Sequence, residues 1–381
     1  MLFQDEVIGT FSGGQGAVQL TVQLNADATP SNVRALLRNV VYATTDGNPT
    51  IISKTLWVRL TDGDGELGPA VTNPFTITPV NDRPTVSSLG DDLTFVEDGN
   101  PLRIASTAVI DDVDSPNFDS GELTVRFSAG ASLQDRLAIA NAGNLSTNGN
   151  EVLFGTNVIG NFSGGIGLTP LVITLNSRVS PALAQIVLRS ITFSNDSENP
   201  AASVRTLLFR LTDGDGGSSL PATKLLNVEP INDAPVLGGI GGSVGYMSNG
   251  SAVLLASTAT VTDVDSPNFA LGKLTVRAIS GGDPTNRIDL GGSLFTIDAN
   301  NNVLRSGLSI GTLNANGGRG LNKFEVTFNA EALPNYVQQL VRAIRFRTID
   351  NANPNNREIS FTLTDGDGGT SARLIKTVAL G

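Results

Sequence analysis

The chain contains no cysteine and no histidine among its 381 residues. This excludes disulfide bonds, thiolate nucleophiles, zinc sites built from Cys and His, and the Ser-His-Asp triad. Aromatic residues make up only 5% of the chain and charged residues only 16%. Glycine, in contrast, occurs 42 times, about 11% against a usual ~7%. This composition is typical of a turn-rich, mostly β protein.

Positive charge is also scarce. The 25 Lys and Arg residues face 36 Asp and Glu residues, for a net charge of −11. Nucleic acid and anionic membranes repel such a chain, so we expect neither as a partner. No apolar run reaches the ~18 residues of a membrane-spanning helix, which argues against membrane insertion. The start, Met1 to Glu6, has no basic segment and no long apolar core, so we do not read it as a secretory signal. The chain is then either cytosolic or a piece of a mature protein.

Several strings of residues recur at one spacing. Leu-Thr-Asp-Gly-Asp-Gly begins at Leu60, Leu211 and Leu363, so its copies are 151 and 152 residues apart. Asn-Asp-x-Pro, Asp-Val-Asp-Ser-Pro-Asn-Phe and Phe-Ser-Gly-Gly-x-Gly each occur twice, again 151 residues apart. Such self-similarity is the signature of repeated structural units. It predicts a partial repeat at residues 1–83 and complete repeats at 84–234 and 235–381.

The first repeat matches only the later part of the unit. Leu2-Phe3 aligns with Leu153-Phe154, which leaves no counterpart of residues 84–151. Half of a β domain exposes unpaired strand edges. We therefore expect residues 1–83 not to form a self-sufficient domain. The missing strands come either from a longer parent chain, which we favour, or from another chain that adds a strand.

Each repeat shows short strands and one helix. Apolar residues alternate with polar ones at 18–24, 56–60, 207–211 and 359–363, and further short strands are expected at 123–127 and 274–277. A helix is expected after Thr29-Pro30, Ser180-Pro181 and Pro334, each opened by proline at its first turn. Its apolar positions follow helical spacing in the first repeat at Val33, Leu36, Leu37, Val40 and Val41, and in the third at Val337, Leu340, Val341 and Ile344. The fold class predicted is mostly β, with tandem β-sandwich repeats of about 151 residues, each carrying one short helix.

Acidic motifs are the only candidate sites that carry chemistry. In Asp112-x-Asp114-x-x-Asn117, side chains two residues apart in a loop aim oxygen atoms at one point. Ca²⁺ takes six to eight oxygen ligands, mostly carboxylates and carbonyls. Each motif alone is also typical of a turn, because Asp-Gly favours hairpins and Asn-Asp-x-Pro favours an Asx turn. Together the motifs favour a metal, since so many like charges near one junction would otherwise repel.

The order of these motifs resembles a known family. A strand, an Asp-Gly hairpin, a second strand and Val-x-Pro-x-Asn-Asp-x-Pro resemble the end of bacterial cadherin-like repeats of large secreted adhesins and surface proteins. From Asp82, an acidic residue follows at +15 (Glu97) and Asp-x-Asp at +30 (Asp112), which also looks like a cadherin. The resemblance implies cadherin/Ig-like sandwiches, an extracellular or cell-surface location, and Ca²⁺ at the junctions between successive domains.

Carried over residue by residue, the resemblance implies two sets of ligands. The junction before the second repeat would use Asn81, Asp82, Asp112, Asp114, Asn117 and Asp213. The junction before the third would use Asn232, Asp233, Asp263, Asp265, Asn268 and Asp365, with Glu97 from the preceding repeat. Asp46, Asp196 and Glu198 lie in loops that are able to join these sites. The chain departs from the family in its longer repeat and in Ser248, which stands at +15 in the last repeat and would weaken a further junction.

The sequence is compatible with three functions from different classes. The first is an extracellular structural and adhesive protein, stiffened by calcium and assembled into a surface fibre or filament through neighbouring repeats of the same or another chain. The second is a glycan-binding module that contacts a cell-surface glycan or protein, although three Tyr and one Trp offer little for sugar stacking. The third is a hydrolase with a carboxylate pair. Because the same carboxylates recur in the repeats, we expect no enzyme activity.

Overall fold

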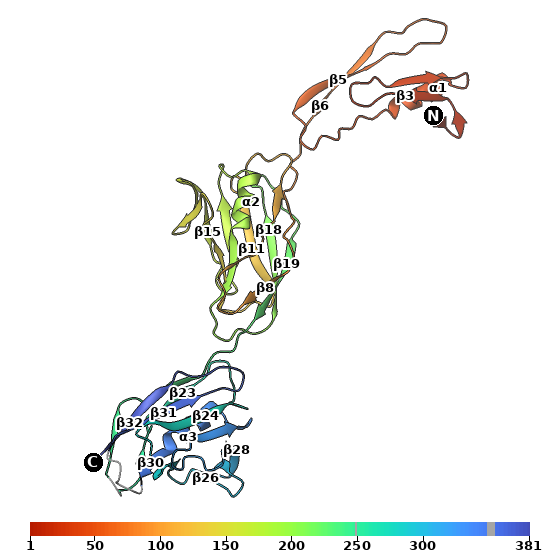
Figure 1. The fold of residues 1–381 in the computed structure, drawn as a ribbon. Coiled ribbons are helices and arrows are strands. Elements are labelled where there is room, and N and C mark those ends of the chain that lie inside the picture. The colour runs from red at the N-terminus through yellow and green to blue at the C-terminus, as the bar shows by residue number, and fades with distance from the viewer. Residues whose placement is uncertain (248–249, 349–354) are drawn as a thin grey trace. The chain divides into compact units, whose positions relative to one another are not determined.

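The computed structural model describes residues 1–247, 250–348 and 355–381 (Figure 1). The chain forms two compact units, Met1–Asp82 and Arg83–Gly381. The larger unit contains two separate apolar cores, one from the second repeat and one from the third. Strands dominate both repeats, and each carries one short helix. The predicted fold class, mostly β with sandwich-like repeats, is therefore confirmed.

The second repeat is built around one large sheet. Its eight strands follow the order β13-β14-β15-β16-β11-β18-β19-β8, and smaller sheets β12-β17-β9 and β10-β7 lie beside it. The strands are β7 (Thr85–Ser87), β8 (Leu93–Val96), β9 (Leu102–Arg103), β10 (Val109–Asp111), β11 (Glu122–Ala129), β12 (Asp135–Ile139), β13 (Leu145–Asn148), β14 (Glu151–Phe154), β15 (Asn157–Ser163), β16 (Leu171–Leu175), β17 (Ile191–Asn195), β18 (Val204–Leu211) and β19 (Ala222–Glu229). Apolar side chains of the large sheet and of the smaller sheets meet in one core.

The third repeat copies this arrangement strand for strand. Its large sheet has the order β21-β32-β31-β24-β29-β28-β27-β26, with β22-β30-β25 and β20-β23 as the smaller sheets. The strands are β20 (Val236–Gly238), β21 (Ser243–Tyr246), β22 (Val253–Leu254), β23 (Thr260–Thr262), β24 (Lys273–Ser280), β25 (Asn286–Leu290), β26 (Phe295–Ile297), β27 (Asn302–Arg305), β28 (Leu308–Leu313), β29 (Phe324–Phe328), β30 (Ile344–Thr348), β31 (Arg357–Leu363) and β32 (Leu374–Leu380). The predicted weak point at Ser248 lies outside the described residues.

The three helices begin at the predicted prolines. They are α1 (Pro30–Arg38), α2 (Pro181–Arg189) and α3 (Pro334–Ala343). The side chains of Thr29 and Ser180 cap α1 and α2 by accepting a backbone hydrogen bond, whereas Leu333 at the start of α3 provides no such cap. The predicted apolar pattern runs past the end of two helices. Val41 follows α1 and is 86% exposed, and Ile344 opens strand β30 instead of closing α3. None of the helices in the described residues has the length and hydropathy needed to cross a bilayer.

The first unit has less structure than the complete repeats. It consists of α1 and three strand pairs, β1 (Leu2–Phe3) with β2 (Glu6–Val7), β3 (Gly9–Ser12) with β4 (Thr21–Leu24), and β5 (Ile52–Val58) with β6 (Val71–Ile77). Its glycine-rich string forms the turn between β3 and β4, where Gly13, Gly14 and Gly16 all have positive φ. Ile8 and Val33 are the buried apolar side chains that the structure describes in this unit. An apolar core comparable to that of the other repeats is therefore not assembled from residues 1–82.

Candidate metal site

The candidate site lies where the second repeat runs into the third. Strand β8 pairs in parallel with β19, with Val96 opposite Glu229. This pairing carries Glu97, the next residue, to the start of the linker, where its N–H donates to the carbonyl of Glu229 at 2.9 Å. Its Oε2 accepts a hydrogen bond of 2.7 Å from the N–H of Ile231. Glu97 is therefore fixed beside the linker by the sheet of the second repeat.

The linker itself is bound to two loops of the third repeat. Asn232 donates through Nδ2 to Oδ2 of Asp365 at 2.9 Å, and the N–H of Asp233 donates to Oδ2 of Asp265 at 2.9 Å. Asp365 is fully buried, and its Oδ1 accepts from the N–H groups of its own Asp-Gly loop. The Asp-Gly loop around Asp365 is therefore a hydrogen-bonded turn. It also directs the carboxylate of Asp365 toward Asn232 in the linker.

Three buried carboxylate oxygens in this region lack a hydrogen-bond donor among the described residues. They are Oε1 of Glu97, Oδ2 of Asp263 and Oδ1 of Asp265. Glu97 is only 3% exposed. Buried polar atoms in folded proteins are nearly always paired, because an unpaired one loses its hydration without compensation. The carboxylate of Asp265 acts electrostatically on both Glu97 and Asp263, so these unpaired oxygens belong to side chains that sense one another. Their shared lack of a donor favours a cation in this region.

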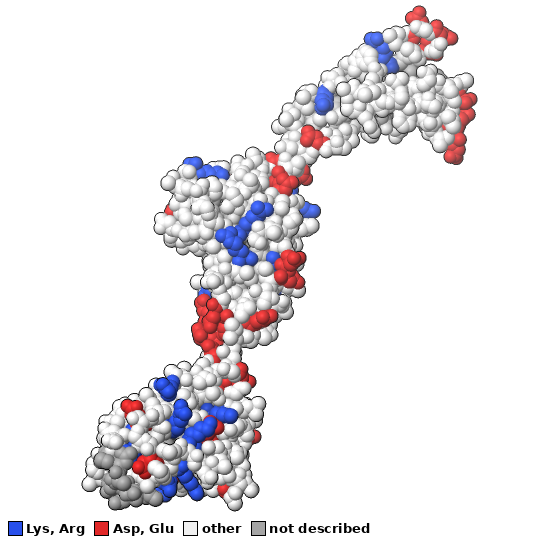
Figure 2. Space-filling model, in the orientation of Figure 1, with Lys and Arg blue, Asp and Glu red and all other residues white. Residues whose placement is uncertain are grey.

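A second group of carboxylates lines the outer side of the same linker. One oxygen each from Asp98, Glu198 and Asp233 lies within 4.8 Å of the others. A hollow of about 420 Å³ opens here, and Glu198, Asp233 and Asp263 contribute to its wall. Figure 2 shows acidic side chains gathered around this part of the chain. The carboxylates of Glu198, Asp233 and Asp263 thus border a space large enough for an ion.

Burial, together with neighbouring carboxylates and hydrogen bonds, shifts the pKa values of these groups. Burial raises the pKa of Asp263 to about 6, helped by the side chain of Asp265. Burial also raises the pKa of Glu97 and of Asp233, and neighbouring carboxylates add to both shifts. In Asp365, burial is outweighed by the hydrogen bonds from Asn232 and from backbone N–H groups, which lower its pKa. The folded protein without an ion therefore holds several carboxylates under electrostatic stress.

The ligand set predicted from the sequence differs from the carboxylates that the structure brings together. It omits one of them and gives another only an accessory role. Asp98 is absent from the predicted ligand set, although it directly follows Glu97 and belongs to the second group of carboxylates. Glu198 was named only as an accessory residue, yet it belongs to the outer group. The oxygen of Asn268 accepts from the N–H of Ala270 inside its own loop, the behaviour of an Asx turn. Ligand roles for the predicted residues stay a prediction.

The predicted first junction is divided between the two units. Asn81 and Asp82 belong to the first unit, whereas Asp112, Asp114, Asn117 and Asp213 belong to the second. Within the second unit, Oδ1 of Asp112 accepts from the N–H groups of Asp114 and Ser115, and Oδ2 of Asp112 is buried without a donor among the described residues. Burial raises the pKa of Asp112. The Asp112 loop therefore repeats the local features of the Asp263 loop.

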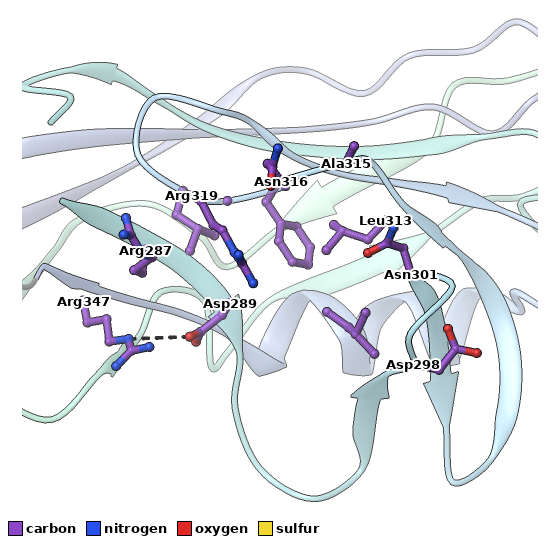
Figure 3. A pocket seen from close by; sticks show the side chains of 14 residues that line it. Arg287, Asp289, Asp298, Asn301, Leu313, Ala315, Asn316, Arg319 and Arg347 are labelled. Carbon is purple, nitrogen blue, oxygen red and sulfur yellow. Dashed lines mark ion pairs between the residues drawn. The ribbon is translucent and has the colours of Figure 1, made fainter. Parts of the chain in front are cut away.

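A second hollow, in the third repeat, bears on the glycan alternative (Figure 3). It has a volume of about 710 Å³, and its wall includes Arg287, Asp289, Arg319 and Arg347. Asp289 forms an ion pair with Arg347 at 3.7 Å and a closer one with Arg345. The lining contains one aromatic residue, Phe324, which is fully buried. A sugar would find hydrogen-bond partners here but no aromatic face for stacking, so the metal site is the better supported of the two.

Comparisons with known proteins find no matching family model and no matching curated protein. Among solved structures, the chain matches protocadherin gamma B2 extracellular cadherin domains 3–6 with 15% identity and a TM-score of 0.27, over 86% of this chain and 57% of that one. It matches human CDH23 EC21–23 with 12% identity and a TM-score of 0.27, over 86% and 74%. It also matches an endo-fucoidan hydrolase of glycoside hydrolase family 107 with 10% identity and a TM-score of 0.19, over 99% and 37%. The chain thus spans little more than half the length of the matched protocadherin.

Proposed function

We propose that this chain is an extracellular structural and adhesive repeat protein in which Ca²⁺, bound at the linker, fixes the third repeat relative to the second. The observation that carries the proposal is the set of unpaired buried oxygens on Glu97, Asp263 and Asp265. All are carboxylate oxygens, the ligand type that Ca²⁺ prefers. The absence of nitrogen and sulfur ligands from His and Cys argues against zinc or copper.

The two repeats contribute different parts of this site. Glu97, Asp98 and Glu198 come from the second repeat, and Asp263, Asp265 and Asp365 come from the third. An ion held by both sets would oppose rotation of the linker, because any change of angle would separate its ligands. The bound ion would supply charge neutralisation and no redox chemistry. Repeats joined in this way would transmit force along an array, as expected of an adhesive fibre.

Calorimetry tests the binding step directly. Titration of Ca²⁺ into the metal-stripped chain is expected to show Kd values of about 10⁻⁴–10⁻³ M, the range of extracellular modules. Asp265→Asn should abolish the heat that is released or absorbed when Ca²⁺ binds at this linker. Glu331→Gln removes the same charge from an exposed position of the third repeat and should leave binding unchanged. Equal heats from both variants would contradict the assignment of the site.

Distance measurements test the stiffening. Because the chain has no cysteine, spin labels can be introduced without background at Ser128→Cys and Ser280→Cys, two exposed positions in different repeats. Pulsed electron resonance should show a broad distance distribution with chelator and a narrow one with 10 mM Ca²⁺. Asp265→Asn should keep the distribution broad in both conditions. If Ca²⁺ binds but the distance distribution stays broad, the protein binds calcium and the proposed stiffening of the linker is wrong.

A further inference from the structure

The large sheets of the second and third repeats share one central strand position. In the second repeat β11 lies between β16 and β18, and in the third β24 lies between β29 and β31. Each central strand is antiparallel to both of its neighbours. Leu123 of β11 stands opposite Ile173 on one side and Leu211 on the other, and it is fully buried. This strand therefore joins the two halves of the sheet and fills the core beneath it.

The first unit contains counterparts of the two strands that flank this central strand in the other repeats. Among its described residues, no strand lies between these two counterparts. By the repeat spacing, β4 corresponds to β16 and β5 corresponds to β18. In the first unit β4 pairs with β3 and β5 pairs with β6, and each keeps its second edge without a strand partner in residues 1–82. A groove of about 310 Å³ runs between β4, α1 and β5, and Leu20, Leu37, Leu56, Trp57 and Leu60 are part of its lining.

Matched residues of the two repeats show what the groove lacks. Leu37 is 45% exposed, whereas its counterpart Leu188 is fully buried. Leu60 is 48% exposed, whereas its counterpart Leu211 is fully buried. Apolar side chains thus stand at matching positions in the two repeats, whereas the first unit lacks counterparts of the strands that cover them, β11 among them. The exposure of Leu37 and Leu60 accompanies the absence of these strands from residues 1–82.

A glycine in the adjoining loop points to the same partner. At Gly214, with φ +93°, an added Cβ would lie 1.8 Å from the carbonyl oxygen of Asp119, in the segment that leads into β11. Its counterpart Gly63 has the same φ of +93°, yet nothing lies within 4 Å of the corresponding position. The loop of the first unit therefore keeps the shape that accommodates the approach of this segment.

We propose that this groove binds a β-strand of the β11 type, supplied by the amino-terminal half of a further repeat like residues 84–151. The strand would lie antiparallel to both β4 and β5. The apolar position equivalent to Leu123 would then stand between Val22 and Leu60, and the one equivalent to Val125 between Leu20 and Val58. This binding site is independent of the calcium proposal, because none of its residues is an acidic ligand.

Other occupants fit the groove less well. A folded second copy of this chain has no strand to donate, because β11 and β24 are central in their own sheets and their Leu123 and Leu274 are fully buried. A lipid surface would leave the open backbone groups of β4 and β5 unpaired, which is costly in an apolar medium. An added strand satisfies both the backbone edges and the apolar lining.

Trp57 provides a direct readout, since it lines the groove and is the only tryptophan of the chain. A synthetic peptide with the sequence of residues 119–130 is titrated into the full chain. We expect a saturable blue shift of the Trp57 emission and slower amide hydrogen exchange in β4 and β5. The same peptide with Leu123→Asp and Val125→Asp should bind at least tenfold more weakly, since it cannot fill the apolar positions.

Variants of the full chain complete the test. Leu56→Asp places a charge in the groove and should weaken peptide binding at least tenfold. Ile51→Asp, at a position that is 73% exposed and outside the lining, should leave binding unchanged. If Leu56→Asp disturbs the first unit, the two peptides on the unaltered chain still decide the question. Absence of a Trp57 shift with the unaltered peptide, equal binding of both peptides, or concentration-dependent self-association that the peptide does not displace would overturn the proposal.

Discussion

The N–H of Asp233 donates a hydrogen bond of 2.9 Å to Oδ2 of Asp265, while Oδ1 of the same carboxylate is buried without a donor among the described residues. One oxygen of Asp265 thus accepts a hydrogen bond from the backbone of the linker. The carboxylate of Asp265 also repels those of Glu97, Asp233 and Asp263. The arrangement costs free energy in the metal-free protein, because the two carboxylates of Asp233 and Asp265 repel. We expect the arrangement to become favourable if a cation is shared between them.

Calcium is therefore expected to raise the free energy of unfolding. With Kd values of about 10⁻⁴–10⁻³ M, 10 mM Ca²⁺ should add about 1.4–2.7 kcal/mol per site. Asp265→Asn should remove the contribution of the site at the second linker, and Glu331→Gln should retain it. Urea unfolding with and without Ca²⁺, followed by circular dichroism, measures the difference. A calcium effect of the same size in Asp265→Asn would show that the ion binds elsewhere.

The free energy of unfolding should depend on pH in opposite directions in the metal-free and the calcium-bound protein. In the metal-free protein it should fall as the pH rises. Burial raises the pKa of Asp263 from its ordinary 3.8 to about 6. Between these values the folded protein binds more protons than the unfolded chain, so the free energy of unfolding falls as pH rises. The stability contributed by the protonated form is complete below pH ~4 and is lost by pH ~6. Urea unfolding of the metal-stripped chain at pH 4.5 and 6.5 measures this slope.

Asp263→Asn is the matched variant for this pH effect, because it keeps the shape of the side chain and cannot ionise. It should flatten the metal-free slope in the same pH window. Calcium affinity of the unaltered chain should instead increase from pH 5 to pH 7, since the ion needs ionised carboxylates. Calcium affinity that stays constant over this range would argue against Asp263 as a ligand.

Local sequence signals predicted the fold class and part of the strand pattern. Proline after a capping residue located the start of α1 and α2. Alternation located β18 and β31 and overlapped β4 and β5, although the predicted ranges 18–24 and 56–60 extend beyond Thr21–Leu24 and Ile52–Val58. Prediction was weaker at helix ends. Ile344 fits the apolar spacing of α3 but forms the first residue of β30, because helix and strand share one buried face there. Periodicity alone does not separate the last turn of a helix from the first residue of a buried strand.

The candidate site was predictable in composition but not in its contacts. The linker, the Asp-x-Asp motif and the resemblance to cadherin-like repeats pointed to a set of residues that includes Asn232, Asp233, Asp263, Asp265, Asp365 and Glu97. The position of Glu97 depends on the parallel pairing of β8 with β19, a contact across more than 130 residues that no local pattern reveals. The outer member Asp98 arrives by the same pairing. Pairs that are distant in sequence are thus the part that required the structure.

Glycine at the Asp-Gly loops has a steric role that differs between repeats. Gly214→Ala combines an unfavourable positive φ with a clash against the carbonyl of Asp119. Gly63→Ala has the same φ but open space around it. We expect Gly63→Ala to cost about 1–2 kcal/mol, the backbone penalty alone, and Gly214→Ala to cost more than that. Urea unfolding followed by Trp57 emission reports the first unit, and circular dichroism reports the larger one. Equal losses would show that the close approach at Gly214 relaxes freely.

A buried ion pair in the second repeat provides the last prediction. Asp135 and Arg205 are both fully buried, and Oδ2 of Asp135 lies 3.4 Å from Nε of Arg205. Oδ1 of Asp135 also accepts a hydrogen bond from Asn195, and Oδ2 accepts one from the N–H of Ser132. The third repeat places Asn286 at the position of Asp135 and keeps the arginine as Arg357, whose pKa burial lowers. A carboxylate is nevertheless present near Arg357, because Asp283, at the position of Ser132 by the repeat spacing, interacts with it electrostatically. The same site is therefore built once with Asp135 and once with the amide of Asn286 and the carboxylate of Asp283.

The difference between the two repeats is a guide to how much substitutions at Asp135 should lower the free energy of unfolding. Asp135→Ala leaves the charge of Arg205 buried without its counterion and should cost about 3–5 kcal/mol. Asp135→Asn keeps an oxygen toward Nε of Arg205 but, unlike the third repeat with Asp283, supplies no other carboxylate, so it should cost less than Asp135→Ala and still destabilise the repeat. Adding Arg205→Met to Asp135→Ala removes the stranded charge and should recover part of the loss. Urea unfolding of these three variants tests the argument. If Asp135→Asn were as damaging as Asp135→Ala, the negative charge itself would be required, the charge that Asp283 provides near Arg357 in the third repeat.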